Sequence, residues 1–234
     1  MILLAFVLFL LGTVLLLFPR IEQARYARHA LTMIADFEGR LEVYEKHGDL
    51  AQLRAEIQAY NAQLYESGQA RFVDPFSYQQ VDFSLRAFGF EEEMIGYVSI
   101  ARMDVKLPIF LGASEANLAR GVAHLTQTSL PVGGVNTNAV IAGHRGMRSA
   151  AMFRDIERLV PGDEILIVNF YETLRYRVVE TRVILPTQVG EVLIQSGRDL
   201  LTLITCHPYR FNHQRYLVIA EWVDEMEVEK PPQS

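Results

Sequence analysis

The chain contains a single cysteine, Cys206, so no disulfide bond within the chain can hold its fold together. It also lacks a dense cluster of basic side chains, since 22 lysines and arginines stand against 28 acidic residues and the net charge is −6. Without a basic patch there is no electrostatic footprint for a nucleic-acid partner. No spacing of histidine and carboxylate residues is typical of a metal site, so we expect neither a metal nor a cofactor. The lone thiol is then either a small buried hydrophobe or a group kept for its reactivity.

Charged side chains are also missing from the first 18 residues, MILLAFVLFLLGTVLLLF. As a helix this run would be roughly 27 Å long, close to the thickness of the hydrocarbon layer of a bilayer. A cleaved signal peptide is an alternative, although its apolar core is usually only about 7–15 residues long. A buried core helix is a third interpretation. We predict an uncleaved transmembrane anchor.

Three arginines follow this run, at positions 20, 25 and 28, and no charge precedes it. By the positive-inside rule this distribution favours the folded part on the cytoplasmic face. A resemblance described below implies a single-pass cell-membrane protein with its folded part on the extracellular face. The two indications disagree.

Beyond the anchor, the pattern of apolar residues along the sequence changes twice. A helical apolar period extends to about Ser67, and then Gly68, Asp74-Pro75 and Gly89 break any sustained period. Short apolar runs punctuated by Gly, Pro, Asn and Asp follow, which is typical of strands. The predicted organisation is an anchor (1–19), a helical hairpin (20–68), a lid or connector (69–94), a β-barrel domain (95–224) and a flexible tail (225–234).

Seven of these runs are predicted strands: Tyr97–Ala101, Val105–Phe110, Ala139–Ala142, Glu164–Phe170, Leu174–Leu185, Leu200–Thr205 and Tyr216–Val223. Two segments between them, Glu115–His124 and Ala150–Leu159, look like single helical turns. Many short strands with few helices favour a closed barrel or a sandwich, because sheet edges must be hidden. The fold class is therefore mainly β.

Three residues at predicted strand ends could act together as a catalytic centre. Cys206 and His144 each end an apolar strand, and Arg215 opens the last one. Taken singly, each has an ordinary structural interpretation: a core thiol, a turn histidine and a surface charge. Together they supply a thiolate nucleophile, an imidazole for proton transfer and a guanidinium for an oxyanion.

The motifs around these residues resemble the sortase family of cysteine transpeptidases. Thr202–Cys206 followed by Arg215 is similar to the family signature TLxTC with its downstream arginine, and Ala142–Gly146 is similar to its histidine motif. Features similar to the pilus-assembling branch, class C, are Ser129–Gly134, Ala151–Phe153 and Pro208-Tyr209.

The resemblance implies an eight-stranded β-barrel in which Cys206, His144 and Arg215 are catalytic. The implied substrates are secreted pilins or surface proteins with an LPxTG-like sorting signal, cleaved through a Cys206 thioester. A pilin lysine amine would then resolve the thioester. The branch also has a lid, and Asp74-Pro75-Phe76 would provide it, with Asp74 paired to Arg215 and Phe76 over the thiol.

Alternatives remain open from sequence. The acceptor could be a cell-wall precursor, which would make the protein an anchoring sortase, or the chain could be a non-catalytic membrane module that binds sorting signals. A peptidoglycan transpeptidase with a Ser-His-Gly-Cys run does not fit, because no such run occurs. His207 and His213 are rival bases to His144, and we expect His124 to make a structural hydrogen bond. Class C members usually carry a second, C-terminal transmembrane helix, and residues up to Ser234 include none.

Overall fold

The computed structural model describes residues 2–47, 49–69, 83–88 and 93–223. It begins with two helices, α1 (Ile2–His47) and α2 (Asp49–Glu66). Helix α1 continues through Pro19, so the anchor predicted over 1–19 and the first arm of the hairpin predicted over 20–68 form one continuous helix. Within the apolar stretch the hydroxyl of Thr13 donates to the carbonyl of Phe9 (2.9 Å), which satisfies a polar group that lipid could not.

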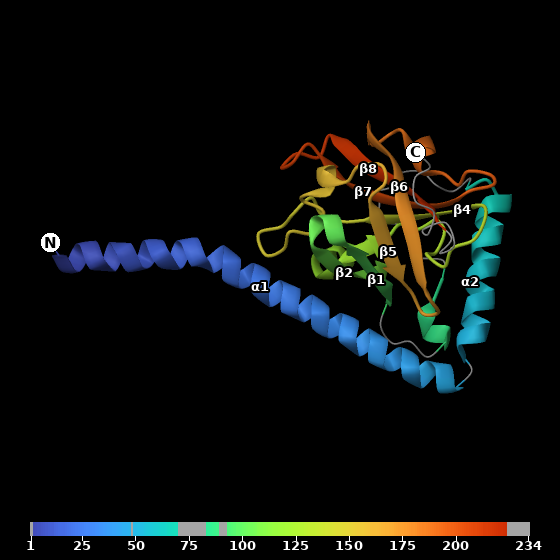
Figure 1. Ribbon diagram of the computed structural model, residues 1–234, viewed down its shortest axis with the longest axis horizontal. Helices are drawn as coiled ribbons and strands as arrows, with labels where there is room; N and C mark the ends of the chain where they lie inside the picture. The colour runs from blue at the N-terminus through green and yellow to red at the C-terminus, as the bar shows by residue number, and fades with distance from the viewer. Residues whose placement is uncertain (1, 48, 70–82, 89–92, 224–234) are drawn as a thin grey trace, which may run out of the picture.

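The N-terminal part of α1 projects clear of the rest of the molecule (Figure 1). Among the described residues, α1 is the one helix that is long and apolar enough to cross a membrane. Its most apolar 18-residue window has a mean hydropathy of 2.8, and none of that window is buried within the protein. An apolar surface of this kind is stable in lipid rather than in water.

The remainder of the chain forms a closed eight-stranded barrel, which confirms the predicted fold class. The strands are β1 (Met94–Ile100), β2 (Val105–Leu111), β3 (Val122–His124), β4 (Thr137–Ala142), β5 (Glu164–Val168), β6 (Thr173–Ile184), β7 (Asp199–His207) and β8 (Gln214–Trp222). Around the barrel the order is β1-β2-β3-β4-β7-β8-β6-β5, and β5 closes on β1. The pairs β2–β3 and β4–β7 are parallel, and the other pairs are antiparallel.

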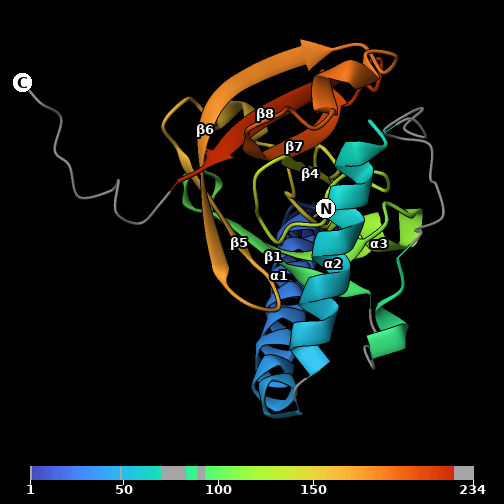
Figure 2. The same ribbon diagram turned by 90° about the vertical axis from the view of Figure 1, so that its right-hand side faces the viewer.

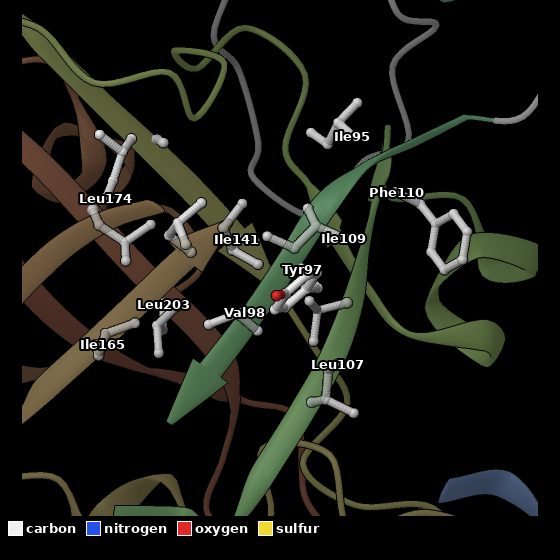
Figure 3. Close-up of a cluster of buried hydrophobic side chains, with 14 of the residues drawn as sticks. Ile95, Tyr97, Val98, Leu107, Ile109, Phe110, Ile141, Ile165, Leu174 and Leu203 are labelled. Atoms are coloured by element: carbon white, nitrogen blue, oxygen red, sulfur yellow. The ribbon is translucent and has the colours of Figure 1, made fainter. Parts of the chain in front are cut away.

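The barrel interior is filled by aliphatic side chains from most of its strands, as Figure 3 shows. Val98, Ile109, Ile141, Ile165 and Leu203 are all fully buried. Burying one such side chain contributes about 1.5–3 kcal/mol, so the barrel is stabilised chiefly by this core. The strands on which the candidate catalytic residues lie are therefore rigid supports.

Helices α1 and α2 meet at an angle, and the barrel lies between them (Figure 1); α2 covers one side of the barrel (Figure 2). The carboxylate of Glu38 on α1 accepts a hydrogen bond from the hydroxyl of Tyr97 (2.6 Å) and lies 3.5 Å from the ammonium of Lys106. On α2, the side chain of Asn61 exchanges two hydrogen bonds with the backbone of Leu130, at 3.1 and 2.8 Å. Both helices are thus fixed to the barrel by specific polar contacts.

The segment predicted as one helical turn, Glu115–His124, divides into two elements. Helix α3 covers Glu115–Arg120, and Val122–His124 is strand β3, the one strand of the barrel absent from the seven predicted, so this part of the prediction was wrong. Three residues are too short to display the alternation of a strand, and all three are buried. In the other predicted turn, Ala150–Leu159, only a 3₁₀ turn at Ile156–Arg158 forms.

Candidate active site

Cys206 and Arg215 lie opposite one another across two antiparallel strands. Their Cα atoms are paired in the register between β7 and β8. Directly opposite residues on one face of an antiparallel pair have Cβ atoms about 4.5–5.5 Å apart, close enough for their side chains to interact. Cys206 is a free thiol of intermediate exposure near the end of its strand, where a substrate can reach it.

His144 lies at the same edge of the barrel, just beyond β4, which pairs with β7 on the side opposite β8. Strand β4 runs parallel to β7 and pairs Ala142 with Ile204, two residues before His144 and Cys206 respectively. The backbone N–H of Gly143 continues this pairing by donating to the carbonyl of Ile204 (3.1 Å). The ends of three adjacent strands, β4, β7 and β8, therefore bring the three sequence-predicted catalytic residues to one edge.

The backbone that carries His144 is held tightly on both sides. The hydroxyl of Thr205 donates to the carbonyl of Gly143 (2.6 Å), and the N–H of Phe153 donates to the carbonyl of His144 (3.0 Å). A Cβ atom at position 143 would lie 2.7 Å from the ring of Phe153 and 2.9 Å from Val122. Glycine is required there because the chain passes so close to its neighbours.

The surroundings of His144 change the pKa of its imidazole, which lies at the surface. Partial desolvation lowers the pKa of His144 below the usual value, and the nearby carboxylate of Glu115 opposes this effect. A lowered pKa favours the neutral ring, the form that can accept a proton from a thiol.

Arg215 is buried, with 8% of its surface exposed. Its Nη1 donates to the carbonyls of Asn212 (2.6 Å) and Gln214 (2.9 Å), which fix the guanidinium at the start of β8. A guanidinium with its position fixed beside a nucleophile can stabilise a developing oxyanion without reorganising.

Sequence reasoning missed a polar cluster beside the backbone of Cys206, formed by Arg145, Glu157 and His207. The buried guanidinium of Arg145 lies 2.7 Å from the carboxylate of Glu157, 2.8 Å from Nδ1 of His207 and 3.4 Å from the carbonyl oxygen of Cys206. Arginine can only donate, so Nδ1 of His207 accepts wherever it bonds Arg145; the same Nδ1 also lies 3.3 Å from the carboxylate of Glu157. The arginine in the Gly-His-Arg-Gly run was the available signal, but its partner Glu157 is brought there only by the fold.

The other histidines have different environments. His207 is engaged with Arg145 through Nδ1, and its ring packs 5.7 Å from that of Tyr216. His213 is exposed, and its ring lies 6.0 Å from that of Phe211. His124 is buried, with Nε2 at 3.1 Å from the carbonyl of Thr128, and burial lowers its pKa to about 4. The hydrogen bond expected of His124 is therefore present.

A cavity of about 460 Å³ lies away from these residues, between α1, the turn joining β1 to β2, and residues 150–152. None of the three candidate catalytic side chains lines it. Within the described ranges, no group of three or more His, Cys, Asp or Glu side chains is arranged to hold a metal ion. Asp74 and Phe76, the predicted lid residues, lie outside the described residues.

The family model of the sortase domain matches residues 98–223, more than half of the chain, and this range contains Cys206, His144 and Arg215. The chain belongs to the sortase family. It is accordingly a cysteine transpeptidase, as its motifs predicted. Sortase A of Bacillus anthracis is 30% identical over 169 residues, which cover 71% of this chain and 79% of that protein.

Solved structures of other sortases have the same fold. Sortase C1 of GBS pilus island 1 is 34% identical, with a TM-score of 0.74, over 88% of this chain and 96% of that one. Sortase C-1 from Streptococcus pneumoniae is also 34% identical, with a TM-score of 0.74, over 82% of this chain and 98% of that one. A lid mutant of Streptococcus agalactiae sortase C1 is 32% identical, with a TM-score of 0.68, over 77% and 92%.

Proposed function

We propose that this sortase polymerises pilins. It would cleave an LPxTG-like sorting signal and transfer the protein to a lysine amine of a second pilin subunit. The observation that carries the catalytic part is the opposition of Cys206 and Arg215 across β7 and β8, with His144 at the adjacent end of β4. The pilus-specific part is supported by similarity to a sortase C1 of a pilus island.

The first half-reaction follows from the properties of these groups. His144 accepts the thiol proton, and the sulfur of Cys206 attacks the Thr–Gly carbonyl of the signal. A C–S bond forms, and the guanidinium of Arg215 donates to the oxyanion of the tetrahedral intermediate. When the C–N bond breaks, the proton moves from His144 to the departing glycine amine. The product is a thioester on Cys206 and a free C-terminal peptide.

In the second half-reaction an amine is the nucleophile and Cys206 is the leaving group. A neutral lysine amine attacks the thioester carbonyl, a C–N bond forms, and its excess proton passes to His144. The C–S bond then breaks, and the thiolate of Cys206 is reprotonated. The product is an isopeptide bond between two subunits.

The choice of acceptor can be tested directly. We expect the full chain, given a protein with a C-terminal LPxTG-like signal together with both a pilin subunit and a cell-wall precursor amine, to form a product in which Thr is joined to a lysine side chain, detected by mass spectrometry of the tryptic digest. A matched pilin with that lysine changed to arginine should not be joined. Transfer only to an amine of a cell-wall precursor would contradict pilus polymerisation and support the anchoring alternative.

We also propose that Asp74-Pro75-Phe76 forms a lid over the active site, with Asp74 paired to Arg215 and Phe76 over Cys206. The support is the motif itself and the similarity to a sortase C1 that has a lid. A partly exposed ion pair contributes about 1 kcal/mol, and the aromatic contact adds a similar amount. Such a lid can be displaced by substrate.

Replacing both Asp74 and Phe76 with alanine should therefore raise the rate at which a thiol reagent alkylates Cys206 several-fold. Hydrolysis of a model signal peptide should also become faster, because water then reaches the thioester. The matched control replaces Asp36 and Val160 instead, which are both exposed and lie outside residues 69–94. An alkylation rate equal to that of the wild type would show that Asp74-Pro75-Phe76 is an ordinary turn.

The proposed location is the cell membrane, with α1 crossing once and the barrel on the extracellular face. The support is the apolar, unburied N-terminal part of α1. This side of the membrane is where a secreted substrate with a sorting signal would meet the enzyme.

A further inference from the structure

A loop beyond the active-site histidine lies against the end of the apolar helix. The guanidinium carbon of Arg148 is 5.3 Å from the centre of the Phe18 ring, within the range of a cation–π contact. Phe18 is the last residue of the apolar run, and Pro19 and Arg20 follow it. If residues 2–18 cross the hydrocarbon layer, Phe18 lies at its outer boundary. Arg148 then lies at the same level.

The depth of this loop is fixed because α1 is fixed to the barrel. The hydroxyl of Tyr26, about 12 Å beyond Phe18 along the helix, donates to the carbonyl of Arg120 (2.9 Å). Farther along α1, Glu38 contacts Tyr97 and Lys106 as described above. Contacts at several levels of one continuous helix keep the barrel from turning away from the membrane surface.

A guanidinium at the edge of the hydrocarbon layer needs an anionic partner. Arg148 and Arg20 are both exposed, and among the residues that the structure describes neither has a carboxylate within salt-bridge distance. Arg25, farther from the boundary, lies 3.8 Å from the carboxylate of Glu22. Phospholipid phosphates occupy this level in every bilayer, and arginine binds phosphate through several parallel hydrogen bonds.

We propose that Gly146–Ser149 is a membrane-contact loop, in which Arg148 together with Arg20 binds phospholipid headgroup phosphates. This inference rests on the proposed anchoring by α1. It gives a role to Arg20, the first of the arginines that follow the span, because this side chain binds headgroups on the side of the barrel. It also puts the active site near the membrane. His144 is four residues from Arg148, which is at most about 14 Å of chain, so His144 is close to the bilayer. The enzyme would thus process a sorting signal presented at the surface of its own membrane.

The single cysteine makes this depth measurable. In the full chain with Cys206→Ala, a fluorophore is attached to Ser149→Cys in the loop, or to Val135→Cys as a reference. Val135 is exposed and lines a groove with α2, on another side of the barrel. Both proteins are placed in phosphatidylcholine–phosphatidylglycerol vesicles that contain a headgroup-attached quencher. We expect strong quenching at position 149 and little at position 135.

Because α1 fixes the depth of the loop, binding of headgroup phosphates is read from which lipid carries the quencher. We expect the label at position 149 to be quenched more when the quencher is attached to anionic phosphatidylglycerol than to phosphatidylcholine, and Arg20→Gln with Arg148→Gln should lower this preference, roughly fivefold for each arginine removed. The matched control is Arg86→Gln, because Arg86 is exposed and its neighbour Leu85 packs beside α2. Equal quenching at positions 149 and 135, in protein that still sediments with the vesicles, would overturn the loop contact and leave the anchor standing. An unchanged preference for the anionic quencher in the double arginine variant would overturn phosphate binding. Failure to sediment would refute the anchor and the loop contact together.

Discussion

Replacing Cys206 with alanine should abolish transpeptidation while the barrel stays folded. The substitution removes one partly exposed sulfur atom near the end of β7, where the side chain is not part of the aliphatic core. We expect the free energy of unfolding to fall by no more than about 1–2 kcal/mol. Product formation from a sorting-signal peptide and chemical denaturation of the same preparation check the two parts of this prediction.

The matched control is Thr202→Ser on the same strand. Thr202 is buried and donates to the side chain of Asn138 (2.9 Å), and serine keeps that hydroxyl. We expect this variant to retain activity even though it loses a methyl group from the interior. Unfolding of the Cys206→Ala protein at room temperature would show that the thiol is structural and would count heavily against its catalytic assignment.

Substitution of either His144 or Arg215 by alanine should slow thioester formation at least ~100-fold. The first variant loses the group that moves the proton, and the second loses an oxyanion donor, whose removal typically costs about 10²–10³ in rate. Single-turnover kinetics with a signal peptide measure the effect on the acylation step itself.

Arg215 needs a second variant because its side chain also holds the backbone of Asn212 and Gln214. Arg215→Lys keeps the charge but loses the planar fork, so we expect it to stay folded and to recover only part of the rate. Arg210→Ala, at an exposed position in the loop between β7 and β8, serves as the control and should be nearly as active as wild type. Full activity of Arg215→Ala would remove this residue from the mechanism.

Much of the barrel could be predicted because most of its strands are apolar runs bounded by turn residues. Leu200–Thr205 is an example: its side chains are all buried, and its apolar composition alone indicated a strand. Val122–His124 could not be found this way, because a strand of three residues is defined by its partners β2 and β4 rather than by its own pattern.

The candidate catalytic residues could be named from sequence because each lies at or just beyond the end of a recognisable strand within a family motif. Their surroundings could not be predicted. The Arg145–Glu157 pair joins two loops through the fold, and the contact between Arg148 and Phe18 joins residues 130 positions apart. Such contacts depend on how the loops and α1 pack on the barrel, and no local pattern encodes that packing.

The most direct test of the central claim is to trap the thioester. The full chain is mixed with a peptide carrying an LPxTG-like signal, without an amine acceptor, quenched in acid, and measured by intact-protein and peptide mass spectrometry. The account predicts an adduct equal to the peptide up to its threonine, attached to Cys206, released by hydroxylamine and absent from Cys206→Ala. Cleavage of the peptide without an adduct on Cys206, or with equal efficiency in Cys206→Ala, would contradict it.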